Sequence, residues 1–214
     1  MRKLLNIVLS IFLALFVIGL SVIITMHIKS IYYNDIDKLN IESMSGLSRE
    51  EIIENYDYLI DYNLSWNAEE FELPSLPSSP NGKIHFEEVR DIFQGVKILT
   101  IMSGIISIIG GVIYIRKREF KFLRNASILI VIMPVLLAIP IAIDFNTCFI
   151  MFHKIMFSND YWIFNPRIDP VINMLPETFF MHMGISILLI MLIVSVILQL
   201  IYRRTKKLNY GNEK

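Results

Sequence analysis

The chain has 214 residues, and hydrophobic residues make up 54% of it against 19% charged residues. Its mean hydropathy of +0.54 is high for a soluble domain of this size, which indicates a chain solvated largely by lipid. The 20 basic and 20 acidic residues cancel, so the composition excludes a basic, nucleic-acid-binding protein. The single cysteine, Cys148, excludes an intrachain disulfide and a cysteine-based zinc site. The sequence has no GxGxxG, P-loop or HExxH motif, so we expect no nucleotide, cofactor or metal.

Four segments are apolar and long enough to cross a bilayer, which takes about 20 residues of helix. They are residues 4–28, 96–115, 126–143 and 179–202, and their interiors contain no Asp or Glu. The first segment follows two basic residues, as a signal peptide would. It is too long for a signal peptide and no small-residue cleavage site closes it, so we predict a retained helix.

The charges between these segments predict the topology. Residues 1–3, 116–125 and 203–214 together hold 12 basic residues and two acids. Residues 29–95 hold 14 acids and five basic residues, and residues 144–178 hold four acids and two basic residues. Because short positive loops stay in the cytoplasm, we predict cytoplasmic termini, a basic cytoplasmic loop at 116–125, and a cap outside formed by 29–95 and 144–178.

The predicted fold is therefore an all-α membrane protein with four transmembrane helices and a small extracytoplasmic cap. Ser48 and Glu51 form a capping-box pattern that opens a cap helix through about Asn63. Residues 71–86 contain three prolines and an Asn-Gly pair, which predict a short extended or hairpin segment before a helix that starts at Phe86. In the second span, small residues recur every four positions and predict a close helix-packing face: Ser103, Ser107 and Gly111, with Gly104 and Gly110 alongside.

Histidine is the side chain best suited to move a proton near neutral pH. The predicted topology places all four histidines near the outer membrane surface: His27, His85, His153 and His182. Residues 145–180 hold nine aromatic residues, more than an interfacial belt needs. On a helix, Phe149, His153 and Phe157 share one face at spacings of four, which predicts an imidazole within a dry aromatic pocket suited to acyl chains.

Two other sites deserve comparison with this one. Met181-His182-Met183 offers soft ligands for copper(I), but neighbouring helical residues point about 100° apart and do not converge on one ion. Cys148 is an alternative nucleophile, although a lone buried cysteine more often only packs. Neither interpretation is preferred, and the roles of His27, His182 and Cys148 stay open.

The order of spans and loops, together with two motif blocks, resembles the four-helix integral membrane family that includes lipoprotein intramolecular transacylase. The first block is His85-Phe86-x-x-Val89-Arg90. The second runs through Asp144-Phe145, Phe152-His153-Lys154, Phe157-Ser158-Asn159-Asp160-Tyr161-Trp162, Asp169-Pro170 and Leu175-Pro176-Glu177-x-Phe179-Phe180. The match covers essentially the whole chain in order.

This resemblance implies an acyltransferase of the bacterial cell membrane, with its active site where the cap meets the outer leaflet. Its substrate would be a lipoprotein whose N-terminal cysteine carries diacylglycerol. The sn-2 acyl chain would move to the α-amino group of the same cysteine and leave a lyso-form lipoprotein. The family's catalytic histidines correspond to His85 and His153. The resemblance does not indicate which of the two is the base and which is the acid or oxyanion donor.

The residues of the motif blocks suggest further roles around these histidines. We expect substrate contacts, and contacts with membrane lipid, from six side chains: Phe149, Phe152, Phe157, Tyr161, Trp162 and Arg90. Glu88, one turn beyond His85, is expected to orient that imidazole. For Arg90 and Glu88 a plain salt bridge is an equally good interpretation.

Two other functions fit the same sequence. A membrane sensor or accessory protein could bind a partner through its acidic cap, and charge reversals within 42–72 would then abolish function while histidine substitutions would not. A lipid esterase would use water in place of the amine and release free fatty acid. The preferred lipoproteins, the oligomeric state and the regulation do not follow from the sequence.

Overall fold

The structure is a computed structural model that describes residues 2–211. Its described residues form α-helices and one short 3₁₀ helix, with no strand. They divide into two compact units. The span unit comprises residues 1–24, 96–139 and 186–214, and the cap unit comprises residues 25–95 and 140–185.

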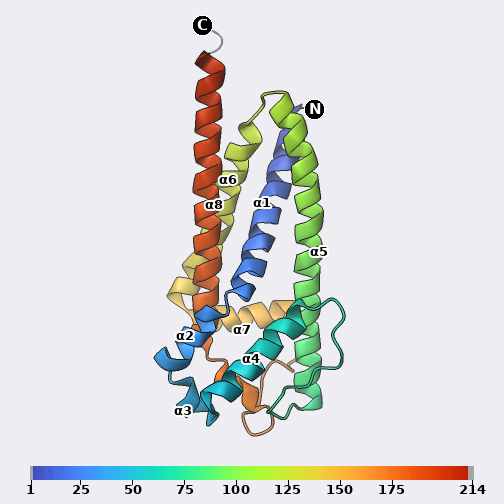
Figure 1. Cartoon of the computed structure of the whole chain (residues 1–214), viewed down its shortest axis with the longest axis vertical. Coiled ribbons are helices and arrows are strands. Elements are labelled where there is room, and N and C mark those ends of the chain that lie inside the picture. Colours follow the sequence, from blue (N-terminus) through green and yellow to red (C-terminus); the bar gives the residue numbers. More distant parts are fainter. Residues whose placement is uncertain (1, 212–214) are drawn as a thin grey trace. The chain divides into compact units, whose positions relative to one another are not determined.

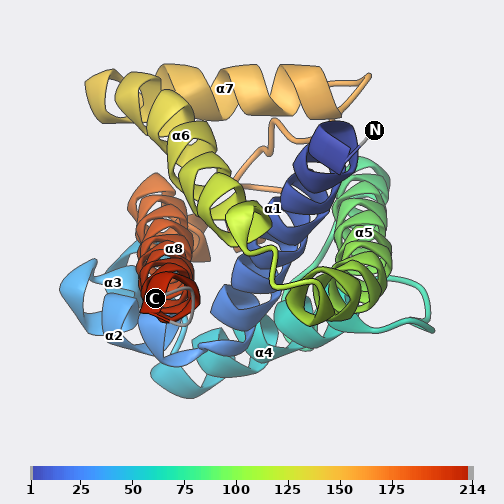
Figure 2. The same ribbon diagram turned by 90° about the horizontal axis from the view of Figure 1, so that it is seen from above.

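The span unit is built on four long helices, which are α1 (Arg2–His27), α5 (Pro80–Arg116), α6 (Lys121–Ile143) and α8 (Glu177–Gly211). Each has a stretch long and apolar enough to cross a membrane, and these stretches run side by side in both views (Figure 1 and Figure 2). Large apolar side chains such as Ile108, Leu136 and Ile193 are exposed on them, as expected of surfaces that face lipid. The all-helical prediction with four membrane helices is confirmed. Of the predicted tail 203–214, residues 212–214 lie outside the described residues.

The predicted small-residue face of α5 packs closely, as expected. Ser103 and Ser107 are buried, and Gly104 and Gly110 lie against Phe16 and Leu9 of α1. A Cβ atom on Gly104 would come within 2.9 Å of the Phe16 ring. Because Gly104 and Gly110 have no side chains, α1 can approach α5 closely at these positions.

We expect Gly104→Val to lower the unfolding free energy by about 1–3 kcal/mol, because the added carbons must push the Phe16 ring aside. Gly95→Val is the matched control, since it makes the same change on α5 where a Cβ atom meets nothing within 4 Å. Thermal unfolding of the purified protein in detergent measures both. Equal losses in the two variants would contradict close packing at Gly104.

The cap unit contains α2 (Ser30–Lys38), α3 (Ile41–Ser45), α4 (Arg49–Leu64), α7 (Phe145–Met156) and the 3₁₀ helix η1 (Pro170–Met174). The predicted capping box opens α4, with the Ser48 side chain accepting from the Glu51 N–H and the Glu51 side chain accepting from the Ser48 N–H. Buried aromatic rings form the core: Tyr32 stacks on Tyr56 with centroids 3.8 Å apart, and its hydroxyl donates to the Met174 carbonyl at 2.7 Å. The cap unit thus has a packed core of its own.

Of the predicted extended or hairpin segment at residues 71–86, the structure has an irregular stretch up to residue 79 and no hairpin. Residues 65–79 belong to no helix or strand, and α5 begins at Pro80 rather than Phe86. Pro80 fits the first helical position, and the Ser79 hydroxyl accepts a hydrogen bond from the Gly82 N–H at 3.0 Å. Asn81 and Gly82 therefore belong to the first turn of a helix, and His85 lies on a formed helix.

Asp169 fixes this helix start. Its carboxylate accepts from the Ser79 N–H at 2.7 Å and from the Ser79 hydroxyl at 2.8 Å. A Cβ atom on Gly82 would approach the Asp169 Oδ1 atom to 2.5 Å, so a larger residue there would displace the carboxylate that holds Ser79. Asp169 is 6% exposed, and the first turn of α5 is consequently held by a buried charge-assisted contact.

Candidate active site

His85 and His153 lie together in the cap unit although they are 68 positions apart in the sequence. His85 projects from α5 and is 5% exposed, and His153 projects from α7, which runs crosswise to α5 (Figure 1). Their ring centroids are 6.0 Å apart and their planes are inclined by 36°. This separation leaves two imidazoles able to act on one small reacting group.

Aromatic rings surround the two imidazoles. Phe157 contacts both, with centroids 4.7 Å from His85 and 5.6 Å from His153. Three other predicted rings contact His153, at centroid distances of 4.2, 4.8 and 5.4 Å for Phe149, Trp162 and Phe152 respectively. The site is therefore shielded from water on several sides, as the aromatic stripe predicted.

Two further aromatic residues belong to this loop. Tyr161 has no ring contact with either histidine, its backbone N–H donates to the Asn159 side chain at 3.0 Å, and its predicted substrate contact stays a prediction. Phe164 was not predicted, yet its ring lies 5.4 Å from His85. Its only signal in the sequence was membership of the aromatic-rich loop, two residues after Trp162.

Hydrogen bonding assigns the proton on His153. Its Nδ1 atom lies 2.7 Å from the carbonyl oxygen of Phe149, which can only accept, so Nδ1 carries the proton and Nε2 keeps a lone pair. The Nδ1 atom of His85 is buried without a partner. Because a buried N–H without an acceptor is rarer than an unused lone pair, the proton of His85 is assigned to Nε2. One imidazole thus offers a base and the other a donor.

Burial keeps both imidazoles neutral. His85 stands on the turns of α5 that precede the apolar stretch from Val96, and there burial, assisted by the charge of His153, lowers its pKa from 6.5 to about 4. Burial also lowers the pKa of His153, and the hydrogen bond to the Phe149 carbonyl opposes that shift. At neutral pH both imidazoles are therefore uncharged, and each carries the single proton assigned to it above.

Asn159 connects the aromatic loop to α5. It belongs to the second motif block, but no role was predicted for it. Its side-chain amide donates to the Glu88 Oε1 atom at 2.7 Å, and its backbone carbonyl accepts from the Trp162 indole at 3.1 Å. Glu88 has no hydrogen bond to His85, so the predicted orienting contact is not made in this structure. Its Oε2 atom is buried without a partner.

Arg90 is held away from the histidines. Its Nη2 atom donates to the backbone carbonyl of Trp66 at 2.9 Å, and its guanidinium lies 5.6 Å from the centroid of the Tyr62 ring. It forms no ion pair with a described acidic residue, so the salt-bridge interpretation does not apply to it. The substrate contact predicted for Arg90 stays a prediction.

The remaining candidates lie outside the histidine pair. His182, on the first turns of α8, bonds through Nδ1 to the Asp35 carboxylate of α2 at 2.8 Å. Cys148 is a half-buried free thiol on α7. Neither contacts His85 or His153 through an aromatic or hydrogen-bonded interaction.

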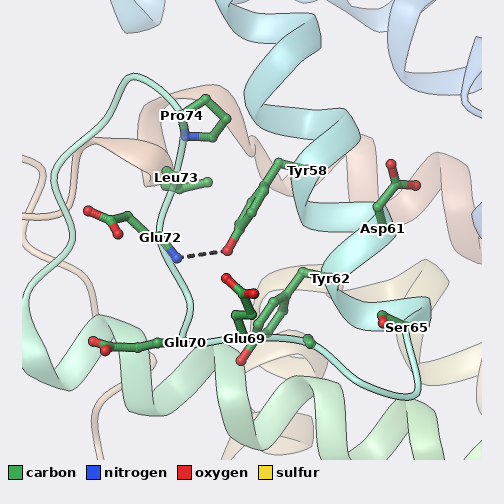
Figure 3. A pocket seen from close by; sticks show the side chains of 10 residues that line it. Tyr58, Asp61, Tyr62, Ser65, Glu69, Glu70, Glu72, Leu73 and Pro74 are labelled. Atoms are coloured by element: carbon green, nitrogen blue, oxygen red, sulfur yellow. Dashed lines mark hydrogen bonds between the residues drawn. The ribbon is translucent and has the colours of Figure 1, made fainter.

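Two cavities open on the cap unit. One, of about 430 Å³, adjoins the histidine pair through Phe157 and is also lined by Glu88, Ile92, Lys154, Met156 and Ser158. The other, of about 570 Å³, lies between α4 and residues 65–74 (Figure 3). There the Tyr58 hydroxyl accepts a hydrogen bond from the Glu72 N–H at 2.8 Å, Tyr62 lies beside Glu69, and neither histidine lines the cavity. This acidic hollow is the surface that a partner-binding cap would use.

Comparison with known proteins gives a consistent result. Residues 7–180 match the family described as lipoprotein intramolecular transacylase Lit. The chain is similar to the membrane-integral lipoprotein intramolecular transacylase Lit from Bacillus cereus, with 39% identity, a TM-score of 0.94, and coverage of 98% of this chain and 97% of that one. A structure of the same Bacillus cereus protein with an H85R mutation matches at 38% identity and a TM-score of 0.90, over 98% of this chain and 94% of that chain. No curated protein sequence matches.

Four apolar helices and a cap with a water-shielded pair of imidazoles define a membrane-integral transferase. The family match covers most of the chain, and the similarity to the Bacillus cereus protein extends over almost all of it. The chain belongs to the lipoprotein intramolecular transacylase family, and its substrate is a lipoprotein.

Proposed function

We propose that the chain moves the sn-2 acyl chain of a diacylglyceryl-modified lipoprotein onto the α-amino group of its N-terminal cysteine, with His85 and His153 as catalytic residues. The observation that carries this proposal is the histidine pair itself, 6.0 Å apart within an aromatic shell. The Bacillus cereus relative has also been solved with H85R and H85A mutations, and position 85 of this chain is likewise histidine.

His153 acts as the base. Its Nε2 lone pair accepts a proton from the α-amine as the nitrogen attacks the sn-2 ester carbonyl. His85 donates a hydrogen bond from its Nε2–H to the oxyanion of the tetrahedral intermediate. The N–C bond forms, the ester C–O bond breaks, and protonated His153 passes the proton lost by nitrogen to the departing sn-2 oxygen. The reaction is an isomerisation, so it consumes no co-substrate.

Confinement of the substrate supplies much of the rate. The nucleophile and the ester belong to one molecule, so the protein has to hold them in a ring-closing arrangement. Phe149, Phe152, Phe157 and Trp162 are suited to bind the acyl chains and exclude water from the ester. Exclusion of water also favours transfer over hydrolysis, which distinguishes this function from that of an esterase.

The charge distribution supports a location of this site outside the cytoplasm. Basic residues are concentrated at 1–3, 116–125 and 203–214, so we infer that both termini are cytoplasmic and that the cap faces outward. Diacylglyceryl lipoproteins would then reach the histidines from the outer leaflet. Nucleic acids and nucleotides have no part in this reaction.

Tandem mass spectrometry of a reporter lipoprotein tests the proposal. The chain is expressed in a bacterial host that lacks its own lipoprotein N-acyltransferase, and the N-terminal lipopeptide is fragmented to locate each acyl chain. We expect one acyl chain on nitrogen and one on glycerol. Two acyl chains on glycerol, with the protein well expressed, would refute transacylation, and loss of one acyl chain's mass without a new amide would indicate an esterase.

A further inference from the structure

Glu88 carries a carboxylate oxygen that nothing in the cap unit satisfies. The Asn159 amide holds the Oε1 atom at 2.7 Å, whereas the Oε2 atom is buried and has no hydrogen-bond partner. A buried charged acceptor without a donor destabilises a protein, so such a group needs a reason to remain. Glu88 is described in full by the structure, and it forms no ion pair there.

Glu88 stands one turn after His85 on α5. Glu88 lines the 430 Å³ cavity together with Phe157, whose ring contacts both His85 and His153. Lys154 lines the same cavity but lies beyond ion-pair distance of Glu88. Neither histidine lines this cavity, and the Phe157 ring lies between the cavity and the two imidazoles. The Glu88 carboxylate therefore stands next to the histidine pair, in apolar surroundings that include Ile92 and Met156.

We propose that Glu88 binds the N-terminal α-ammonium group of the lipoprotein and thereby selects substrates whose amine is free. This inference rests on the proposed function. An ammonium group has three donors and a positive charge, and a carboxylate oxygen beside it forms a strong charge-assisted hydrogen bond. Asn159 fixes the other oxygen, so the carboxylate is already oriented for the ligand.

The same contact assists release of the product. The ammonium group first releases one proton to the medium, and acyl transfer then converts the neutral amine into an amide, which has one N–H and no charge. The product therefore loses the attraction to Glu88, whereas the substrate keeps it. Glu88 therefore binds the substrate more tightly than its isomer, the product.

Binding of two unreactive lipopeptides tests this directly. Both have an N-terminal cysteine with a thioether-linked glycerol that bears alkyl ethers instead of esters, so no acyl chain can move. One has a free α-amine and the other is N-acetylated. We expect the wild type to bind the free amine about 10- to 100-fold more tightly, the gain typical of a hydrogen bond to a charged group. Glu88→Gln should bind the two with equal affinity.

The variants separate charge from folding. Glu88→Gln keeps an acceptor for Asn159, and Glu88→Asp keeps the charge and should retain a preference for the free amine. Glu87→Gln removes a charge from the exposed neighbouring residue and should behave as the wild type. The ratio of two dissociation constants from one preparation does not depend on its folded fraction, so partial misfolding leaves the test valid.

An unchanged preference in Glu88→Gln, or no preference in the wild type, would overturn the role of Glu88. Failure of the proposed function is recognised separately, from the ester form of the lipopeptide. If the wild type forms the N-acyl product from that ester but Glu88→Gln still prefers the free amine, only the present inference is lost. If the wild type forms no N-acyl product, the proposed function is lost.

Discussion

Replacement of His153 by alanine is expected to lower the rate of acyl transfer by about 100- to 10,000-fold, the usual contribution of a positioned general base. The variant loses the Nε2 lone pair, and the remaining Phe149, Phe157 and Trp162 rings have no group that accepts a proton. His85→Ala should show a loss of similar size, because it removes the donor to the developing oxyanion. The double variant should be little worse than either single variant, since the two imidazoles act on one step.

Rates are measured by mass spectrometry as the N-acyl fraction of a purified diacyl lipopeptide over time. His27→Ala is the matched control, because it removes an exposed imidazole at the end of α1 and should leave the rate unchanged. Retention of full activity in His153→Ala or His85→Ala would remove that residue from the mechanism. Retention in both would favour a non-enzymatic cap that binds a partner.

Acid should destabilise the protein through His85. Its pKa is about 4 in the folded protein and about 6.5 when unfolded, so between these values the unfolded chain binds a proton that the folded protein does not. Stability is therefore greatest above pH 6.5, begins to fall below it, and has lost this full contribution below pH 4. The shift corresponds to about 3 kcal/mol.

The experiment compares unfolding of the wild type and His85→Gln between pH 7 and pH 4. Carboxylates such as Glu51 and Glu70, whose pKa values hydrogen bonds lower, also weaken the fold in acid and do so equally in both proteins. Glutamine does not titrate, so the variant should lose about 3 kcal/mol less than the wild type across this range. Parallel curves for the two proteins would show that His85 is not the group responsible.

Local patterns in the sequence predicted local structure well. The apolar runs predicted the four long helices, and Ser48 with Glu51 predicted the start of α4, because each signal depends on residues within a few turns of one another. The start of α5 was predicted wrongly since an Asn-Gly pair outside a helix usually forms a turn. Here the Ser79 cap and its contact with Asp169 decide the outcome, and Asp169 is 90 residues away.

In the candidate site, too, local features could be predicted from the sequence and contacts between distant segments could not. Periodicity placed Phe149 and His153 on one face of α7, but the approach of His153 to His85 depends on how α5 and α7 pack, and only the family resemblance suggested it. Phe164 and Asn159 escaped prediction because their importance comes from contacts with His85 and Glu88 on another segment. For Glu88, the sequence predicted a relevant position, whereas the structure joins it to Asn159 instead of His85.

The tie between Ser79 and Asp169 bears on how the protein is made. Ser79 precedes α5 and Asp169 follows α7, so the two meet only after the intervening spans α5 and α6 have been synthesised. The same holds for His85 on α5 and His153 on α7, because α6 lies between these two helices in the sequence. A chain arrested during translation before α7 therefore contains His85 without His153. The first turn of its α5 lacks the contact with Asp169. The order of synthesis therefore brings His153 to His85 only after α7 has been made.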